Sequence, residues 1–134
     1  MAIAVPAVVV STNDVISIEN SLNSLFDIQN TTNGLLPYAG RPFRTQTSFT
    51  YHLYTLIGVA DHYFYTVSKP LWMEISTIVN TNKCQQGNVT YLSSLWSKYK
   101  FAISFSLANI DQTGLMNVTA PADWLRFGMG GHNI

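Results

Sequence analysis

Residues 88–110 read NVTYLSSLWSKYKFAISFSLANI, and this stretch decides the fold class. Apolar side chains recur along it every three or four residues, which places them on one face of an α-helix. Lys98 and Lys100 mark the wetter side, and Asn88 or Thr90 can cap the first turn. The predicted buried face consists of Leu92, Leu95, Trp96, Tyr99, Ala102, Ile103, Ser106, Leu107 and Ile110.

Two further segments have the same period. Residues 15–29 follow Ser11-Thr12-Asn13, a capping cluster, and stop before Asn33-Gly34, which predicts a helix of about four turns. Residues 48–66 form a helix with an apolar stripe, and four tyrosines spread round the rest; a helix apolar on most sides is expected to be buried on most sides. That stripe comprises Leu53, Leu56, Ile57, Ala60 and Phe64. Strand-type alternation never runs longer than a few residues, so the predicted class is all-α, arranged as helical hairpins.

A similar closing phrase follows the first and the last of these helices. Asn33-Gly34-Leu35-Leu36 and Thr113-Gly114-Leu115-Met116 each place a glycine where a left-handed residue often follows a helix end. The two glycines lie 80 residues apart, which suggests a repeated unit of two helices and a loop. Two ordinary glycine caps are the alternative.

Composition excludes several classes of protein. Of the 134 residues, 47% are hydrophobic and only 10% charged, which is incompatible with a disordered chain. The net charge is zero, so nucleic acid is not an expected partner. Cys84 is the sole cysteine, so neither an internal disulfide nor a thiolate metal site can form. Residues 1–10 are apolar but lack a basic start and are too short to span a bilayer, so we expect neither a signal peptide nor a membrane segment.

Three Asn-X-Thr sequons occur, at Asn30, Asn88 and Asn117. Each is next to residues expected in a turn or at a helix start, where a glycan is tolerated. Three such sites in a short chain favour a secreted glycoprotein.

Two loops have the composition of a sugar site. Residues 35–47 read LLPYAGRPFRTQT, and residues 117–134 read NVTAPADWLRFGMGGHNI. Aromatic planes stack on the C–H faces of sugars, while Asp, Arg, Asn and His side chains bond their hydroxyls. Asp123 is the best candidate, with a turn-forming role as the alternative.

Other chemistries fit less well. The glycines at 128, 130 and 131 do not form a phosphate-binding fingerprint after a strand. His52 and His62 are ten residues apart on one helix and do not share the face that two metal ligands need, so no metal site is expected and packed histidines are the better interpretation.

At these loops the chain resembles a known family. The strings AIAVPAVVVSTND, SLNSLFDIQN, GLLPYAG, SFTYHLYTLIGV, LWSKYKFAISFSLANID, GLMNVT and ADWLRFGMGGHN together resemble the six-hairpin domain of alpha-L-rhamnosidase-type glycoside hydrolases. The similarity covers nearly all of residues 3–66 and 87–134. It implies an (α/α)6 barrel, of which residues 1–134 form a part, with a substrate pocket at one end.

The resemblance also implies which residues contact the substrate and which parts of the catalytic machinery are expected in other segments. Substrate-contacting or pocket-shaping roles fall on Tyr38, His52, Asp123, Trp124, Arg126, His132 and Asn133. Similar proteins carry the segments expected to supply the catalytic acid and base outside the part matched by this chain. We therefore expect no catalytic residue and no activity in this chain alone, and no metal or organic cofactor. The whole enzyme would be secreted and would cleave terminal alpha-L-rhamnosyl or related bonds with inversion. A non-catalytic carbohydrate-binding helical module and a helical interaction protein are the alternatives.

Residues 67–86, VSKPLWMEISTIVNTNKCQQ, interrupt the resemblance. Similar proteins pass through a tight turn here, and removal of these 20 residues leaves the seamless junction YFYTGNVTYLSSLW. A translated short intron would have this appearance. A surface loop is the alternative, because loops accept insertions at small entropic cost.

Overall fold

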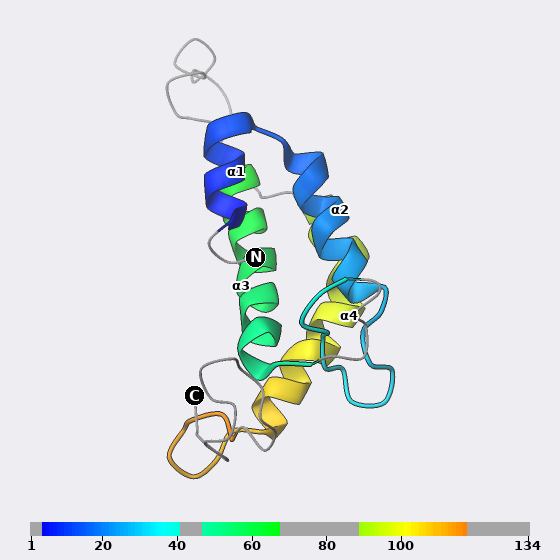
Figure 1. The fold of residues 1–134 in the computed structure, drawn as a ribbon, viewed down its shortest axis with the longest axis vertical. Helices are drawn as coiled ribbons and strands as arrows, with labels where there is room; N and C mark the ends of the chain where they lie inside the picture. Colours follow the sequence, from blue (N-terminus) through cyan, green and yellow to red (C-terminus); the bar gives the residue numbers. More distant parts are fainter. Residues whose placement is uncertain (1–3, 41–46, 68–88, 118–134) are drawn as a thin grey trace, which may run out of the picture.

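A computed structural model describes residues 4–40, 47–67 and 89–117. These ranges are all-α, as predicted, with helices α1 (Ala4–Thr12), α2 (Val15–Phe26), α3 (Phe49–Val67) and α4 (Val89–Ala108) (Figure 1). Within them there is no strand, and the only strand-type pairs are two isolated bridges, Pro37 with Thr47 and Ile110 with Met116.

Helix α1 was not among the predicted helices. Pro6 lies in its first turn, where a missing N–H breaks no hydrogen bond of the helix. The chain then turns at Asn13, whose positive φ of 54° suits an asparagine. The prediction that Ser11-Thr12-Asn13 caps α2 is wrong, because Ser11 and Thr12 still belong to α1. The cap of α2 is Asp14, whose side chain accepts a hydrogen bond from the Ser17 N–H at 3.0 Å.

The helices form two hairpins that pack side by side. α1 and α2 make the first hairpin, and α3 and α4 run up and down beside it (Figure 1). α3 is the central element, because it packs against all three other helices. Both helices of the first hairpin, as well as α4, therefore pack against α3.

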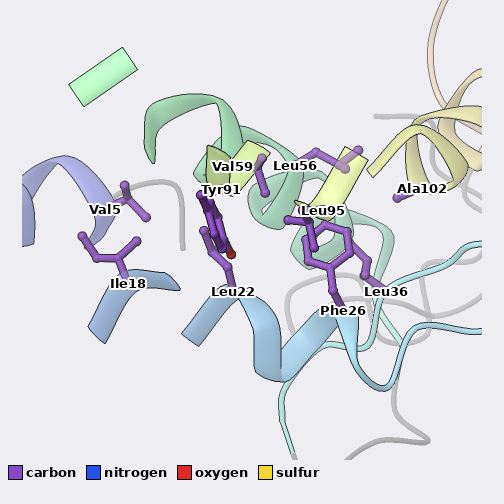
Figure 2. Close-up of a cluster of buried hydrophobic side chains, with 10 residues drawn as sticks. All are labelled: Val5, Ile18, Leu22, Phe26, Leu36, Leu56, Val59, Tyr91, Leu95 and Ala102. Atoms are coloured by element: carbon purple, nitrogen blue, oxygen red, sulfur yellow. The ribbon is translucent and has the colours of Figure 1, made fainter. Parts of the chain in front are cut away.

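The core lies between these four helices and includes one residue of the segment after α2. Leu22 and Leu36 are fully buried at its centre, and Phe26 is 1% exposed. Figure 2 shows the cluster, which consists of Val5, Ile18, Leu22, Phe26, Leu36, Leu56, Val59, Tyr91, Leu95 and Ala102. Such a contiguous cluster from every helix is what holds a small helical domain together.

The predicted face of α3 is only partly right. Leu56 is buried, but Ile57 is 47% exposed and Phe64 is 64% exposed. The side that packs inward is marked by Phe49, His52, Leu56, Val59 and His62, at steps of three or four residues. A helix with apolar residues all round has no unique stripe, so its period does not show which side packs inward. The packed positions expected for His52 and His62 are confirmed.

The predicted face of α4 is closer to the structure. Leu95 and Ala102 are buried, and Lys98 and Lys100 are exposed as predicted. Trp96 and Leu107 were expected to be buried but are 46% and 63% exposed, and neither belongs to a buried cluster. Ile110 lies beyond the end of the helix, and Thr90 lies inside it rather than at the cap.

The segments after α2 and α4 are built alike. Gly34 and Gly114 both have positive φ, 83° and 80°, as the closing phrases predicted, although each lies several residues beyond its helix because α2 already ends at Phe26. In each segment an Asn or Asp starts the turn: Oδ1 of Asn30 accepts from the Thr32 N–H, and Oδ1 of Asp111 accepts from the Thr113 N–H, both at 2.8 Å. The backbone N–H groups of Asn30 and Asp111 donate to the carbonyls of Leu35 and Leu115.

Several predictions lie outside the described residues. These are residues 68–86 of the proposed insertion with Cys84, the sequon at Asn88, and most of the second loop, residues 118–134. In the part of the chain that is described, no helix is both long and apolar enough to cross a lipid bilayer.

Candidate functional site

The two predicted loops start at the same end of the molecule, which we call the loop end. It comprises residues 27–40 and 109–117 and the first turns of α3, in the lower half of Figure 1. Leu35 from the first segment and Met116 from the second pack together with Phe49 in a small buried cluster. Residue 117, where the second predicted loop begins, therefore follows directly on this cluster.

A row of three tyrosines, two exposed and one half-buried, lies at the loop end. The Tyr38 and Tyr51 rings meet edge to face with their centroids 5.1 Å apart, and the Tyr51 and Tyr54 rings follow at 6.2 Å. Tyr51 is 38% exposed and Tyr54 is 42% exposed, so both rings reach solvent. We call Tyr38, Tyr51 and Tyr54 the tyrosine row. Its ring faces suit C–H groups, and its hydroxyls can both donate and accept hydrogen bonds.

His52 fastens the segment that carries Tyr38. The ring is fully buried, and its Nδ1 accepts a hydrogen bond from the Leu36 backbone N–H at 3.0 Å. Because Nδ1 is an acceptor, the proton of the neutral ring is on Nε2, which faces the Ala102 carbonyl at 3.2 Å and the Ser106 hydroxyl at 3.0 Å. The imidazole thus joins the segment after α2 to both α3 and α4.

Burial lowers the pKa of His52 to about 4, although the Ala102 carbonyl opposes this shift. The ring is therefore neutral near pH 7, which keeps Nδ1 available as an acceptor. These contacts hold Leu36, two residues before Tyr38, against α3. A pocket-shaping role for His52 stays a prediction. A direct contact between His52 and a substrate stays a prediction.

The second histidine of α3, His62, is packed as the sequence predicts, but no sequence pattern indicates the side chains that surround it. His62 on α3 is 1% exposed; its Nε2 lies 3.2 Å from a Glu19 carboxylate oxygen, and its ring lies on that of Tyr91, with centroids 4.7 Å apart. The contact is a close polar approach that does not meet the geometry of a hydrogen bond. Burial lowers the pKa of His62 and Glu19 partly opposes it, while burial raises the pKa of Tyr91.

This group ties three helices together. The Tyr91 hydroxyl donates to the Glu19 carbonyl at 3.3 Å and to the Asn23 side-chain oxygen at 3.1 Å. It connects α2, α3 and α4 at the opposite half of α3 from His52, about 15 Å along the helix. We therefore treat it as structural. Nothing in the period of α2 indicates a histidine partner for Glu19.

Only two of the predicted substrate residues, Tyr38 and His52, are described, and the structure does bring them to one end. Asp123, Trp124, Arg126, His132 and Asn133 lie outside the described residues. Of the sequons, Asn30 and Asn117 are exposed. Among the residues that are placed, no three His, Cys, Asp or Glu side chains gather as a metal site would require.

Tyr51 and Tyr54 were not predicted as site residues, although the sequence held a signal. They follow the Tyr38 loop and are spaced by three residues, so they share one face at the start of α3. Because α3 was expected to be buried on most sides, neither tyrosine was predicted to be exposed.

Comparison with known proteins adds no family assignment. No protein-family model matches the chain, and no curated protein matches it with significance.

Proposed function

We propose that this chain is part of a secreted six-hairpin glycosidase of the alpha-L-rhamnosidase type, and that its described residues form one wall of the sugar-binding end. The tyrosine row carries the proposal, because it presents adjacent exposed rings where both predicted loops start. A terminal rhamnosyl group is a 6-deoxy sugar, whose methyl group and C–H face suit such rings while its hydroxyls suit polar loop residues.

The arrangement of the helices supports an (α/α)6 barrel. Two helical hairpins are followed by segments built alike, which is what a barrel of repeated hairpins requires. The outer side of α3 leaves Ile57, Phe64 and Tyr65 exposed. We propose that further hairpins of the whole enzyme cover this side, because large apolar side chains gathered on one face commonly mark an interface.

The proposed role in the whole enzyme is binding and positioning of the sugar. By the resemblance, an acid and a base from other segments would act on opposite faces of the ring with a water between them. The described carboxylates near α2 have structural partners: Asp14 caps α2, Glu19 lies against His62, and Asp27 pairs with Lys98 at 3.0 Å. The same observation favours the second candidate, a non-catalytic carbohydrate-binding module.

The experiment compares three tyrosine variants for binding. The chain is titrated with a rhamnosyl disaccharide and followed by NMR, with Tyr51→Ala and Tyr54→Ala against Tyr65→Ala. Tyr65 is the matched control, because it is 42% exposed like Tyr54 but lies at the other end of α3. Loss of one stacking plane should weaken binding about 3- to 10-fold in the first two variants only. Equal affinity in all three folded variants would contradict the tyrosine row as the site.

Turnover distinguishes the two candidates. If a longer protein that contains this chain hydrolyses an aryl alpha-L-rhamnoside, the glycosidase is supported. If sugar binding depends on Tyr51 but no longer protein shows turnover, the binding module is supported. No rhamnoside binding at all would exclude both.

A further inference from the structure

A second surface feature lies apart from the tyrosine row. An open groove of about 450 Å³ runs between the segment after α2 and the middle of α4. Phe26 and Phe101 both line it, but Phe26 is only 1% exposed, so Phe101, at 39% exposed, is the aromatic residue open to solvent. Asn30 forms part of its wall, and we call it the Asn30 groove. Its volume falls in the ~300–1,000 Å³ range of small-molecule sites.

The walls of this groove are held together by direct bonds. Gln29 donates from Nε2 to the Gly34 carbonyl at 2.9 Å and to the Lys98 carbonyl at 3.0 Å, which ties the segment to α4. Lys98 also pairs with Asp27 at 3.0 Å across one edge. Gly34 approaches α4 so closely that a Cβ on it would lie 2.5 Å from the Phe101 carbonyl oxygen. The groove is therefore a fixed feature of the hairpin junction.

Asn30 is oriented by its own turn. It is exposed and starts the sequon Asn30-Thr31-Thr32. Its side chain receives hydrogen bonds from the backbone N–H groups of Thr32 at 2.8 Å and of Asn33 at 3.3 Å. Because both partners are donors, the atom that faces them must be Oδ1. Nδ2, the atom that carries an N-glycan, therefore faces away from the turn backbone.

We propose that Asn30 carries an N-glycan whose first N-acetylglucosamine lies in the Asn30 groove and covers the Phe101 ring. The inference rests on the secretory location contained in the proposed function. In the attachment, Nδ2 bonds to the anomeric carbon of a lipid-linked oligosaccharide pyrophosphate, the carbon–oxygen bond to the pyrophosphate breaks, and Nδ2 loses one proton.

Two arguments favour N-acetylglucosamine as the occupant of the groove. A sugar joined to the groove's own wall has a high effective concentration there, so even a weak contact is populated. Its C–H face and acetamido methyl group suit the exposed Phe101 ring, while Ser97, Asp27 and Lys98 line the same groove with polar groups for its hydroxyls. An aromatic ring that would otherwise face water is thereby covered.

The test uses two substitutions at one position. The full chain is produced in a secreting eukaryotic host as wild type, Thr32→Ser and Thr32→Ala. Thr32→Ser keeps the sequon and Thr32→Ala removes it, and both leave the Asn30 side chain and the other sequons in place. Glycopeptide mass spectrometry should find Asn30 occupied in the first two and empty in the third. The Tm of the third should be about 2–6 °C lower.

Two further measurements assign the effect to the first sugar and to Phe101. Enzymatic trimming to a single N-acetylglucosamine should keep the higher Tm. Phe101→Leu should abolish the Tm difference between the glycosylated form and the Thr32→Ala form, whereas Phe64→Leu, an exposed phenylalanine on α3 outside the groove, should preserve it.

Three results would overturn the inference: an empty Asn30 beside occupied Asn117, an occupied Asn30 with no Tm difference, or a Tm difference that Phe101→Leu leaves unchanged. Absence of glycan at all three sequons would overturn it together with the proposed secretion, so the two failures are distinguishable.

Discussion

His52 and His62 are the same residue type on the same helix, and both are buried, yet they hold different parts of the molecule. His52 joins the segment carrying Tyr38 to α4 through two ring nitrogens with protein partners. His62 lies between Glu19 and Tyr91 and joins the three longer helices. In both cases burial lowers the pKa of the imidazole, so the folded state favours the neutral ring.

This preference predicts a stability that depends on pH. The pKa of His52 falls from 6.5 to about 4 on folding, and that of His62 falls as well. A lowered histidine pKa gives stability that is complete above about pH 6.5 and is lost as the pH falls toward the folded value. For His52 the loss should approach about 3 kcal/mol. Urea unfolding between about pH 7.5 and pH 4.5 measures it.

The control is His52→Gln, which should have a shallower pH dependence while His62 supplies the remainder. Asp14 does not confuse the result, because its pKa is lowered from 3.8 and its contribution is lost only at more acidic pH. A free energy of unfolding that stays constant over the tested range would contradict the neutral buried state of both rings.

At the scale of helices and loops, the sequence predicted which segments are helical better than which side is buried. The periods at 15–29, 48–66 and 88–110 correspond to α2, α3 and α4, with ends shifted by at most three residues. α1 was missed because its apolar residues are almost continuous and give no period. The inward side of α3 was missed because only its neighbours determine it.

The candidate site also combines features that the sequence can and cannot predict. Tyr38 and His52 were predicted from a resemblance, but no sequence pattern shows the hydrogen bond that His52 accepts from the Leu36 backbone N–H. The two glycines were predicted from local turn chemistry, which operates within a few residues and can be recognised in sequence.

These glycines offer a matched test of the two similar segments. Both have positive φ, so alanine at either position costs about 1–2 kcal/mol of backbone strain. A Cβ at Gly114 meets nothing within 4 Å, whereas at Gly34 it would strike the Phe101 backbone. We expect Gly34→Ala to lower the free energy of unfolding by at least about 2 kcal/mol more than Gly114→Ala. Chemical denaturation of both variants measures this; similar losses would show that the segment after α2 can move away from α4.

On the scale of the whole molecule, the four described helices make one core but leave an apolar side of α3 in solvent. Ile57, Phe64 and Tyr65 are 47%, 64% and 42% exposed on that side. The loop end presents aromatic rings, and its described carboxylates, Asp27 and Asp111, are engaged in an ion pair and a turn. Under the proposed function, sugar binding and catalytic chemistry would therefore lie in different segments.

Glycoside hydrolysis needs two carboxyl groups about 5–10 Å apart across the bond, one of them kept protonated. The chain has seven Asp and Glu residues. Among the described ones, Asp14 and Asp111 hold turns or caps, Glu19 lies against His62, and Asp27 pairs with Lys98. Asp61 is half-buried on α3, and Glu74 and Asp123 lie outside the described residues.

We therefore expect the isolated chain, shown to be helical by circular dichroism, to release no product from an aryl alpha-L-rhamnoside above the level of an Asp123→Asn control. The physical reason is that a carboxylate already engaged in a cap or an ion pair cannot also protonate a leaving group without losing that partner. Tyr51→Ala tests the binding role: it should weaken sugar binding, and turnover should be absent both with and without the substitution. Turnover that Asp123→Asn removes would mean that this chain holds a complete acid and base, and the division between binding and chemistry would be wrong.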